Sequence, residues 1–253
     1  TISNKFFKKM KLNLNFVTKT TRLGQDNEII FFKSKKLKSK YLNIINDNIF
    51  SNKLFLEENF VRRDYNDKSF VLVNCTKCKV SLDYEKIGSN LYKFLNDNKI
   101  ENSFINANSN SLTNIELEKT LHGAQLKSYD FSFYKSDKSK AFQTNLNVVG
   151  NNIKKTNFLR IKLKALLDGV FFTRDLVSEP GNILHPDEYA KRVAKLRKYG
   201  LKVTILDQKK LKKLGCNALL GVGQGSVRGS YLVTMEWNGS KNKSKPLAFV
   251  GKG

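Results

Sequence analysis

The sequence predicts an α/β protein with two folded parts. Segments with strand patterns alternate along the chain with segments of helical spacing, which favours a largely parallel sheet. Forty per cent of the 253 residues are hydrophobic, enough to bury a core. All three prolines and 11 of the 15 glycines follow residue 160. A domain boundary is therefore expected near 140–157, where charged and Asn-rich sequence indicates a loop.

Strand and helix patterns alternate in the first part. Strands are predicted at residues 12–16, 28–32, 70–74 and 103–106, from alternating or continuously apolar runs. Helices are predicted at residues 41–50, 82–97 and 112–127, from apolar residues at helical spacing. Together these elements are sufficient for one α/β domain.

The second part begins with a long helix predicted at 157–178. Pro180 ends it, because a proline disfavours helical geometry at the residue before it. Pro186 suits the first position of the next helix, which Gly200 ends.

A short helix is predicted between Asp207, a good N-cap, and Gly215, a good residue to follow a helix. Strands are predicted at residues 201–205, 231–237 and 247–250. We expect an α/β domain that is incomplete at residue 253.

The charge is strongly positive but evenly spread. The net charge of +24 divides into +10 over residues 1–150 and +14 over 151–253. It comes mainly from 38 lysines, beside 28 asparagines, a composition that AT-rich coding sequence also produces. The densest basic run, residues 33–40, is more often a solvated surface than a phosphate contact. A nucleic-acid-binding or regulatory module based on the basic first domain remains the alternative function, and a basic patch on one face of that domain would favour nucleic-acid binding.

Location follows from what the sequence lacks. The apolar runs fall far short of the ~20 residues that a membrane span needs, and no secretory signal opens the chain. The three cysteines, Cys75, Cys78 and Cys216, cannot form a disulfide framework for this length. A reducing, cytoplasmic location and no membrane partner are expected.

Three motifs have more than one explanation. Cys75 and Cys78 have the spacing of a redox or zinc motif, but two incidental cysteines at a strand end are more common. The Gly-rich residues 221–226 match neither phosphate-binding pattern and predict a tight turn. His122 and His185 have no acid or nucleophile at an informative spacing, so no catalytic residues are expected within this chain.

From Thr173 onward the sequence resembles the leucyl aminopeptidase (M17) family, also called cytosol aminopeptidases. The segments that carry this resemblance, in order and spacing, are residues 174–182, 209–215, 218–226 and 246–253. Upstream, residues 122–131 resemble the end of the family's N-terminal domain. One departure is Pro180-Gly181-Asn182, where the family has Pro-Pro-Asn.

The resemblance implies a macro-like N-terminal α/β domain at 10–145, a linker and connecting helix at 146–180, and the truncated start of the catalytic domain at 181–253. It implies two divalent metal ions (manganese, zinc or magnesium), peptide substrates and a homohexamer. Lys252 is the one metal ligand that carries over. In the family the next ligand is an Asp in a Thr-Phe-Asp stretch that follows this lysine. We therefore expect this chain to be the N-terminal part of an aminopeptidase and to be inactive as this fragment.

Overall fold

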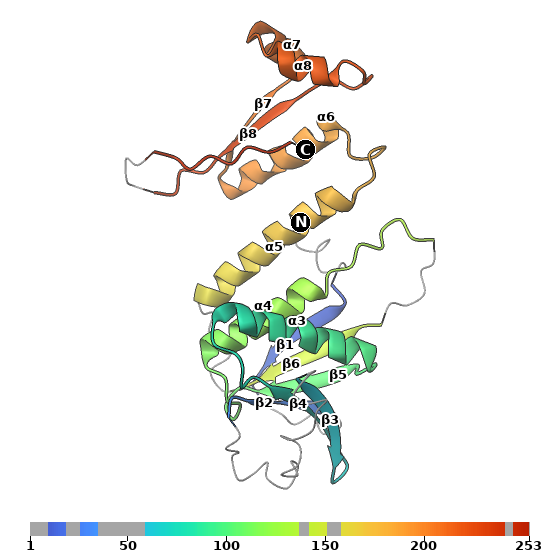
Figure 1. Cartoon of the computed structure of the whole chain (residues 1–253), viewed down its shortest axis with the longest axis vertical. Helices are drawn as coiled ribbons and strands as arrows, with labels where there is room; N and C mark the ends of the chain where they lie inside the picture. The colour runs from blue at the N-terminus through green and yellow to red at the C-terminus, as the bar shows by residue number, and fades with distance from the viewer. Residues whose placement is uncertain are drawn as a thin grey trace. The chain divides into compact units, whose positions relative to one another are not determined.

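The computed structural model describes residues 10–18, 26–34, 59–136, 142–150, 158–240 and 245–252. The chain divides into two compact units, Thr1–Phe172 and Thr173–Gly253 (Figure 1). The helix predicted at 41–50 lies outside the described residues. Among the helices of the described part, none combines the length and the apolar character that crossing a bilayer demands.

The first unit is built on a six-stranded sheet in the order β1-β6-β5-β2-β4-β3. The strands are β1 (Leu12–Val17), β2 (Asn27–Phe32), β3 (Phe60–Tyr65), β4 (Lys68–Asn74), β5 (Asn102–Asn106) and β6 (Thr144–Val149). All neighbouring pairs are parallel except β3 and β4. The predicted α/β class with a parallel-dominated sheet is therefore confirmed.

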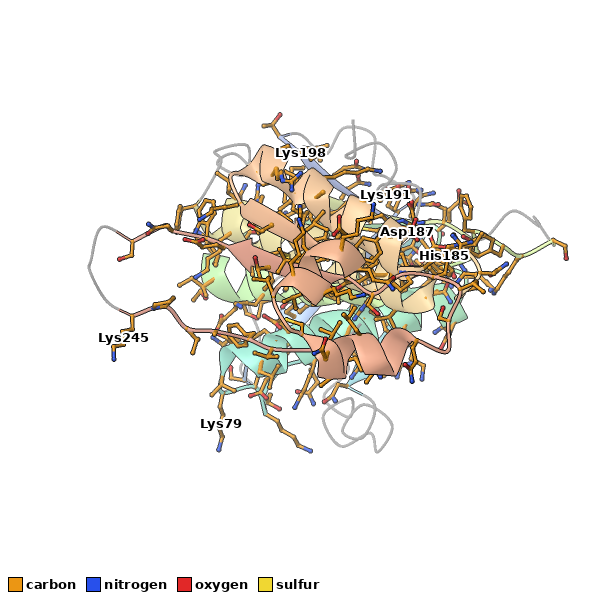
Figure 2. The ribbon with its side chains drawn as sticks, turned by 90° about the horizontal axis from the view of Figure 1, so that it is seen from above. Lys79, His185, Asp187, Lys191, Lys198 and Lys245 are labelled. Atoms are coloured by element: carbon orange, nitrogen blue, oxygen red, sulfur yellow. The ribbon has the colours of Figure 1, made fainter. Side chains whose placement is uncertain are left out.

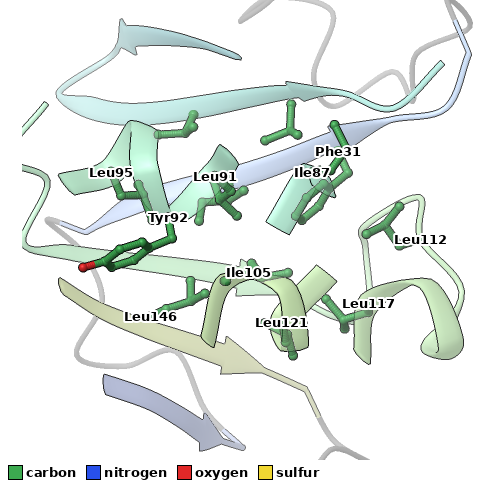
Figure 3. Packing of buried hydrophobic residues seen from close by; sticks show 14 of the residues in the cluster. Phe31, Ile87, Leu91, Tyr92, Leu95, Ile105, Leu112, Leu117, Leu121 and Leu146 are labelled. Carbon is green, nitrogen blue, oxygen red and sulfur yellow. The ribbon is translucent and has the colours of Figure 1, made fainter. Parts of the chain in front are cut away.

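Two helices, α3 (Ser81–Asp97) and α4 (Asn114–Lys127), lie side by side over one face of this sheet (Figure 1). Figure 3 shows their buried leucines packing onto the apolar residues of the strands beneath them. The core includes Phe31, Ile87, Leu91, Leu95, Ile105, Leu117, Leu121 and Leu146. Both helices were predicted within two residues at each end, and α3 shows the clearer apolar face, because the buried side of α4 also contains Glu118, Thr120 and His122.

β3 was not predicted from the sequence. It forms an antiparallel hairpin with β4 through a two-residue turn at Asn66 and Asp67. Their φ angles are 46° and 57°, and two consecutive left-handed residues are typical of a hairpin turn whose twist matches its strands. Four of the six β3 residues are exposed, so the strand has no alternating apolar pattern.

β6 lies within the interval 140–157 where the domain boundary was expected, so this part of the interval is a strand and not a loop. Its polar residues belong to a ladder of amides across the sheet. Asn13 of β1 donates to the side-chain oxygen of Asn145 at 2.9 Å, and Asn15 donates to that of Asn147 at 3.2 Å. The linker expected to follow residue 145 therefore begins within a strand.

The second unit follows the predicted order closely at its start. Its elements, counting the helix that enters it, are α5 (Phe158–Ser178), α6 (Pro186–Ala194), the 3-10 helix η3 (Lys195–Tyr199), β7 (Lys202–Leu206), α7 (Gln208–Lys213), α8 (Asn217–Gly223) and β8 (Leu232–Glu236). Gly200 and Gly215 have φ angles of 90° and 70°, as expected for residues that end helices. Asp207 accepts a hydrogen bond from the backbone N–H of Lys210 at 2.9 Å, so it caps α7 as predicted. β7 and β8 pair in antiparallel orientation.

Two predictions for the second unit need correction. The Gly-rich residues 221–226 were expected to form a tight turn, but the turn is confined to residues 224–226, and Gly221 and Gly223 belong to α8. Neither has a left-handed φ. Residues 247–250 were expected to form a strand, but the structure assigns them none. A strand needs a hydrogen-bonded neighbour, and none of the described strands pairs with this segment.

Candidate metal centre

Lys252 is the metal ligand that the family resemblance assigns to this chain. It is exposed, and it lies in the segment 245–252, which has neither helix nor strand. Within the described ranges, no three His, Cys, Asp or Glu side chains converge into a possible metal site. Two divalent ions need several oxygen, nitrogen or sulfur ligands. The described residues thus supply one candidate ligand and do not by themselves fit a two-metal centre.

The first segment of the resemblance, residues 174–182, covers the end of α5 and the start of the turn between α5 and α6. The turn is closed by the backbone N–H of Ile183, which donates to the carbonyl oxygen of Pro180 at 2.9 Å. From α6, Arg192 donates to Glu179 at 2.9 Å and to Glu188 at 3.0 Å. Burial opposes the charge of Arg192, but the two carboxylates outweigh this and raise its pKa. These ion pairs hold the turn against α6.

The two histidines lie in different surroundings. His122 is buried in α4, with its Nδ1 3.7 Å from Glu85 Oε1 in α3. His185 is the N-cap residue of α6, and its Nδ1 is 3.2 Å from the carbonyl oxygen of Gly181. Figure 2 shows His185 beside Asp187 at the start of α6. Each histidine contacts groups of its own unit, and the structure places neither beside an acid–nucleophile pair.

The cysteine pair follows β4 directly. Cys75 is buried and Cys78 is partly buried, and both are free thiols. The backbone N–H of Cys78 donates to the carbonyl oxygen of Cys75 at 3.0 Å, so the motif forms a closed turn rather than an extended strand end.

Polar groups that were not predicted as a cluster lie near this turn. Lys33, which directly follows β2, donates to Glu116 of α4 at 2.7 Å. Burial opposes ionisation of Glu116, but hydrogen bonds from Lys33, Thr113 and Tyr84 outweigh it and lower the pKa of Glu116 to about 2. One signal was present in the sequence: Thr113 and Glu116 have the spacing of a capping box, which the structure contains. The contacts of Glu116 with Lys33 and Tyr84 depend on tertiary structure, so no sequence pattern indicates them.

Comparison with solved structures defines the class of fold. The chain resembles a tomato leucine aminopeptidase mutant with a TM-score of 0.64 at 18% identity, over 88% of this chain and 50% of that one. It resembles the bottromycin maturation enzyme BotP in complex with Mn with a TM-score of 0.60 at 14% identity, over 88% of this chain and 45% of that one. At these identities the likeness concerns the fold alone.

Sequence comparison shows a resemblance to one family over the second half of the chain. Residues 171–253 match the cytosol aminopeptidase family, catalytic domain. A probable cytosol aminopeptidase of Phytoplasma mali (strain AT) is 47% identical over 137 residues, which are 52% of this chain and 28% of that protein. One of Brucella suis biovar 1 (strain 1330) is 48% identical over 138 residues, which are 52% of this chain and 27% of that protein. The predicted resemblance to the leucyl aminopeptidase family is confirmed, and the matched part spans little more than a quarter of these curated relatives.

Proposed function

We propose that this chain is part of a leucyl-type metalloaminopeptidase, an enzyme that removes N-terminal residues from peptides. The observation that carries the proposal is the match of residues 171–253 to the catalytic domain of the cytosol aminopeptidase family. The fold supports it, because the tomato leucine aminopeptidase mutant is matched over 88% of this chain.

The chain would supply the N-terminal domain, the connecting helix and the start of the catalytic domain. The connecting helix would correspond to α5. β6 would belong to the first domain, because it lies between β1 and β5 in the sheet. The catalytic part would then begin near residue 181, at the turn that precedes α6.

Two divalent ions would polarise the peptide carbonyl and activate a water molecule in such an enzyme. Manganese is the ion to test first, since one structural neighbour is described as a complex with Mn. Lys252 would bind one ion as a neutral amine, which requires loss of its proton when the metal binds. The other ligands would come from parts of the catalytic domain that this chain does not cover, so the 253-residue chain alone would be inactive.

Peptides would be the substrates and a homohexamer the assembly, as the resemblance implies. The name of these relatives, probable cytosol aminopeptidase, supports a cytosolic location. A hexamer is checked by light scattering on the protein that carries the whole catalytic domain.

The proposal is tested by assaying hydrolysis of leucine p-nitroanilide with Mn²⁺. A protein that joins this chain to a complete catalytic domain should hydrolyse the substrate and lose activity on chelation. Lys252→Ala should remove most of that activity, whereas Lys245→Ala, an exposed lysine of the same segment, should not. The 253-residue chain should show no metal-dependent turnover.

Two results would contradict the proposal. Full activity of the Lys252→Ala protein would show that Lys252 is not a metal ligand. Metal-dependent turnover by the 253-residue chain, after controls for host peptidases, would show that the chain holds a complete site of its own.

A further inference from the structure

The turn from Cys75 to Cys78 brings the two free cysteines close together along the backbone. The N–H of Cys75 donates to the carbonyl oxygen of Phe32 at 2.7 Å, and the N–H of Cys78 donates to the carbonyl oxygen of Cys75 at 3.0 Å. A turn closed in this way keeps its first and fourth Cα atoms within about 7 Å. Disulfides join Cα atoms about 4.4–6.8 Å apart, so the two thiols can be linked with little backbone movement.

Side chains on both sides hold this turn in place. The side-chain oxygen of Asn74 accepts hydrogen bonds from the N–H of Thr76 at 3.0 Å and from its hydroxyl at 2.7 Å. Asp83 Oδ2 accepts from the N–H groups of Lys79 and Val80, at 2.8 and 3.0 Å. The cysteines therefore lie between two anchored segments, the end of β4 and the start of α3.

The two thiols differ in exposure and in acidity. Cys75 is 1% exposed and belongs to the hydrophobic core, whereas Cys78 is partly exposed. The hydrogen bond between the two side chains, followed by burial, raises the pKa of Cys75. The same bond lowers the pKa of Cys78. Cys78 is thus the more accessible thiol and the one that ionises first, and the Cys75 thiol donates a hydrogen bond to it.

The charged groups that face the pair come from three elements. Lys33, after β2, favours the thiolate of either cysteine, whereas Glu116 of α4 disfavours it. Asp83 of α3 also opposes ionisation of Cys78. Because Lys33 and Glu116 form an ion pair at 2.7 Å, their effects on the cysteines largely offset each other. The acidity of Cys78 then depends mainly on Cys75.

We propose that Cys75 and Cys78 form a thiol–disulfide exchange site that takes low-molecular-weight disulfides as its substrate. The Cys78 thiolate attacks one sulfur of the substrate, the substrate S–S bond breaks, and one small thiolate leaves. Cys75 loses its proton and attacks Cys78 Sγ, the mixed disulfide breaks, and a second small thiolate leaves. The net reaction converts the protein dithiol and one small disulfide into a protein disulfide and two small thiols. This site lies in the first unit and does not rest on the aminopeptidase proposal.

The test uses the full chain with oxidised glutathione as the probe. Cys216→Ala removes the third cysteine, which lies in the second unit, and serves as the reference protein. Intact-mass spectrometry should show the loss of two hydrogen atoms from this protein, and peptide mapping should place the bond between Cys75 and Cys78. Reduced glutathione in excess should reverse the reaction.

Two further variants assign the roles of the two thiols. Cys75→Ala, which keeps an apolar side chain in the core, should trap one glutathione on Cys78. In Cys78→Ala, the buried Cys75 should react with oxidised glutathione at least about tenfold more slowly than Cys78 does in Cys75→Ala. Circular dichroism shows that each variant is folded before its rate is compared.

Three results would overturn the inference. The first is an unchanged mass of the folded reference protein in excess oxidised glutathione. The second is equal modification rates at Cys75 and Cys78, since the partly exposed thiol would then have no special reactivity. The third is reaction of either thiol only after denaturation.

Discussion

Gly88 of α3 lies directly against the backbone of Thr120 in α4. A Cβ atom built on Gly88 would stand 1.8 Å from the Thr120 carbonyl oxygen. The contact is reciprocal, because a Cβ on Gly123 of α4 would stand 1.9 Å from the carbonyl oxygen of Glu85 in α3. The two helices thus meet backbone to backbone, and neither glycine has room for a side chain.

Gly88→Ala should therefore destabilise the first unit strongly. The added methyl group meets backbone rather than a movable side chain, so we expect a loss of about 3 kcal/mol in the free energy of unfolding, at the upper end for an overpacked position. Urea denaturation followed by circular dichroism measures it. The matched control is Gly169→Ala in α5, where a Cβ meets nothing within 4 Å. That change should stabilise its helix by up to about 1 kcal/mol, and an equal effect of the two substitutions would contradict the contact.

The stability of the first unit should fall in mildly acidic solution because of His122. Burial lowers the pKa of His122, and the attraction of Glu85 only partly opposes this. Lys119, which is 2.8 Å from Glu85, further disfavours a second positive charge there. Among the described residues, neither ring nitrogen of His122 has a hydrogen-bond partner. His122 therefore binds a proton more readily in the unfolded chain than in the folded one. Above the ordinary histidine pKa of about 6.5 both states are neutral and the fold keeps its full stability, whereas at lower pH protonation favours the unfolded chain.

The measurement is the free energy of unfolding between about pH 7.5 and about pH 5, above the range in which most carboxylates titrate. The reference chain should lose stability across this window, and His122→Gln should show a flatter dependence. His185→Gln, at the start of α6, should keep the slope of the reference chain. A slope that persists in His122→Gln would assign the effect to another group.

Arg160→Met should cost about 3 kcal/mol of stability, because it leaves a buried carboxylate without its cation. Arg160 Nε lies 2.9 and 3.2 Å from the two carboxylate oxygens of Glu118, which is 6% exposed. The guanidinium carbon also lies 3.8 Å from the ring centroid of Phe16, so the start of α5 is held to both α4 and β1. Thermal or urea unfolding of the single variant measures the loss.

The double variant Arg160→Met, Glu118→Leu tests whether the loss comes from the unpaired charge. Replacing a buried ion pair by apolar side chains is often nearly neutral. The double variant should therefore recover most of the stability that Arg160→Met loses. If the double variant is as unstable as the single one, the loss comes from packing against Phe16 instead.

Binding of duplex DNA should be weak, independent of sequence and steeply reduced by salt. The +24 charge is mostly lysine, and several lysines of the first unit are paired with carboxylates, among them Lys11, Lys33 and Lys119. We expect a dissociation constant no tighter than about micromolar at physiological salt. Fluorescence anisotropy titrations at several salt concentrations measure both the affinity and the slope. A hundredfold or greater preference for one DNA sequence would instead support the nucleic-acid-binding alternative.

The elements that the sequence predicts are those whose own residues have one dominant pattern. β2 and β4 are continuous apolar runs because both faces of a parallel sheet are covered, and α3 has a single apolar face. α6 and α7 were recognisable from local signals at their ends, such as Pro186 and Asp207. Such signals act within a few residues and require no knowledge of the tertiary structure.

The elements that the sequence does not predict depend on distant partners. The asparagines of β6 look like loop residues until β1 and β5 supply amides to pair with them, as Asn145 shows by donating to Asn102 at 2.9 Å. The glycines of α3 and α4 look incidental until the two helices are placed together. For the candidate site, the sequence indicates the family resemblance and offers Lys252 as a candidate ligand. The contact between Lys33 and Glu116 appears only when β2 and α4 are brought together.

The position of β1 in the sheet has a consequence for synthesis on the ribosome. Among the described strands β1 pairs with β6 alone, and the paired residues Asn13 and Asn145 are 132 positions apart. At about 5–20 residues per second, roughly 7 to 26 s pass between the translation of the two. For that interval β1 emerges without β6, the strand that hydrogen-bonds to it, so the first of the described strands to be made is among the last to join the sheet.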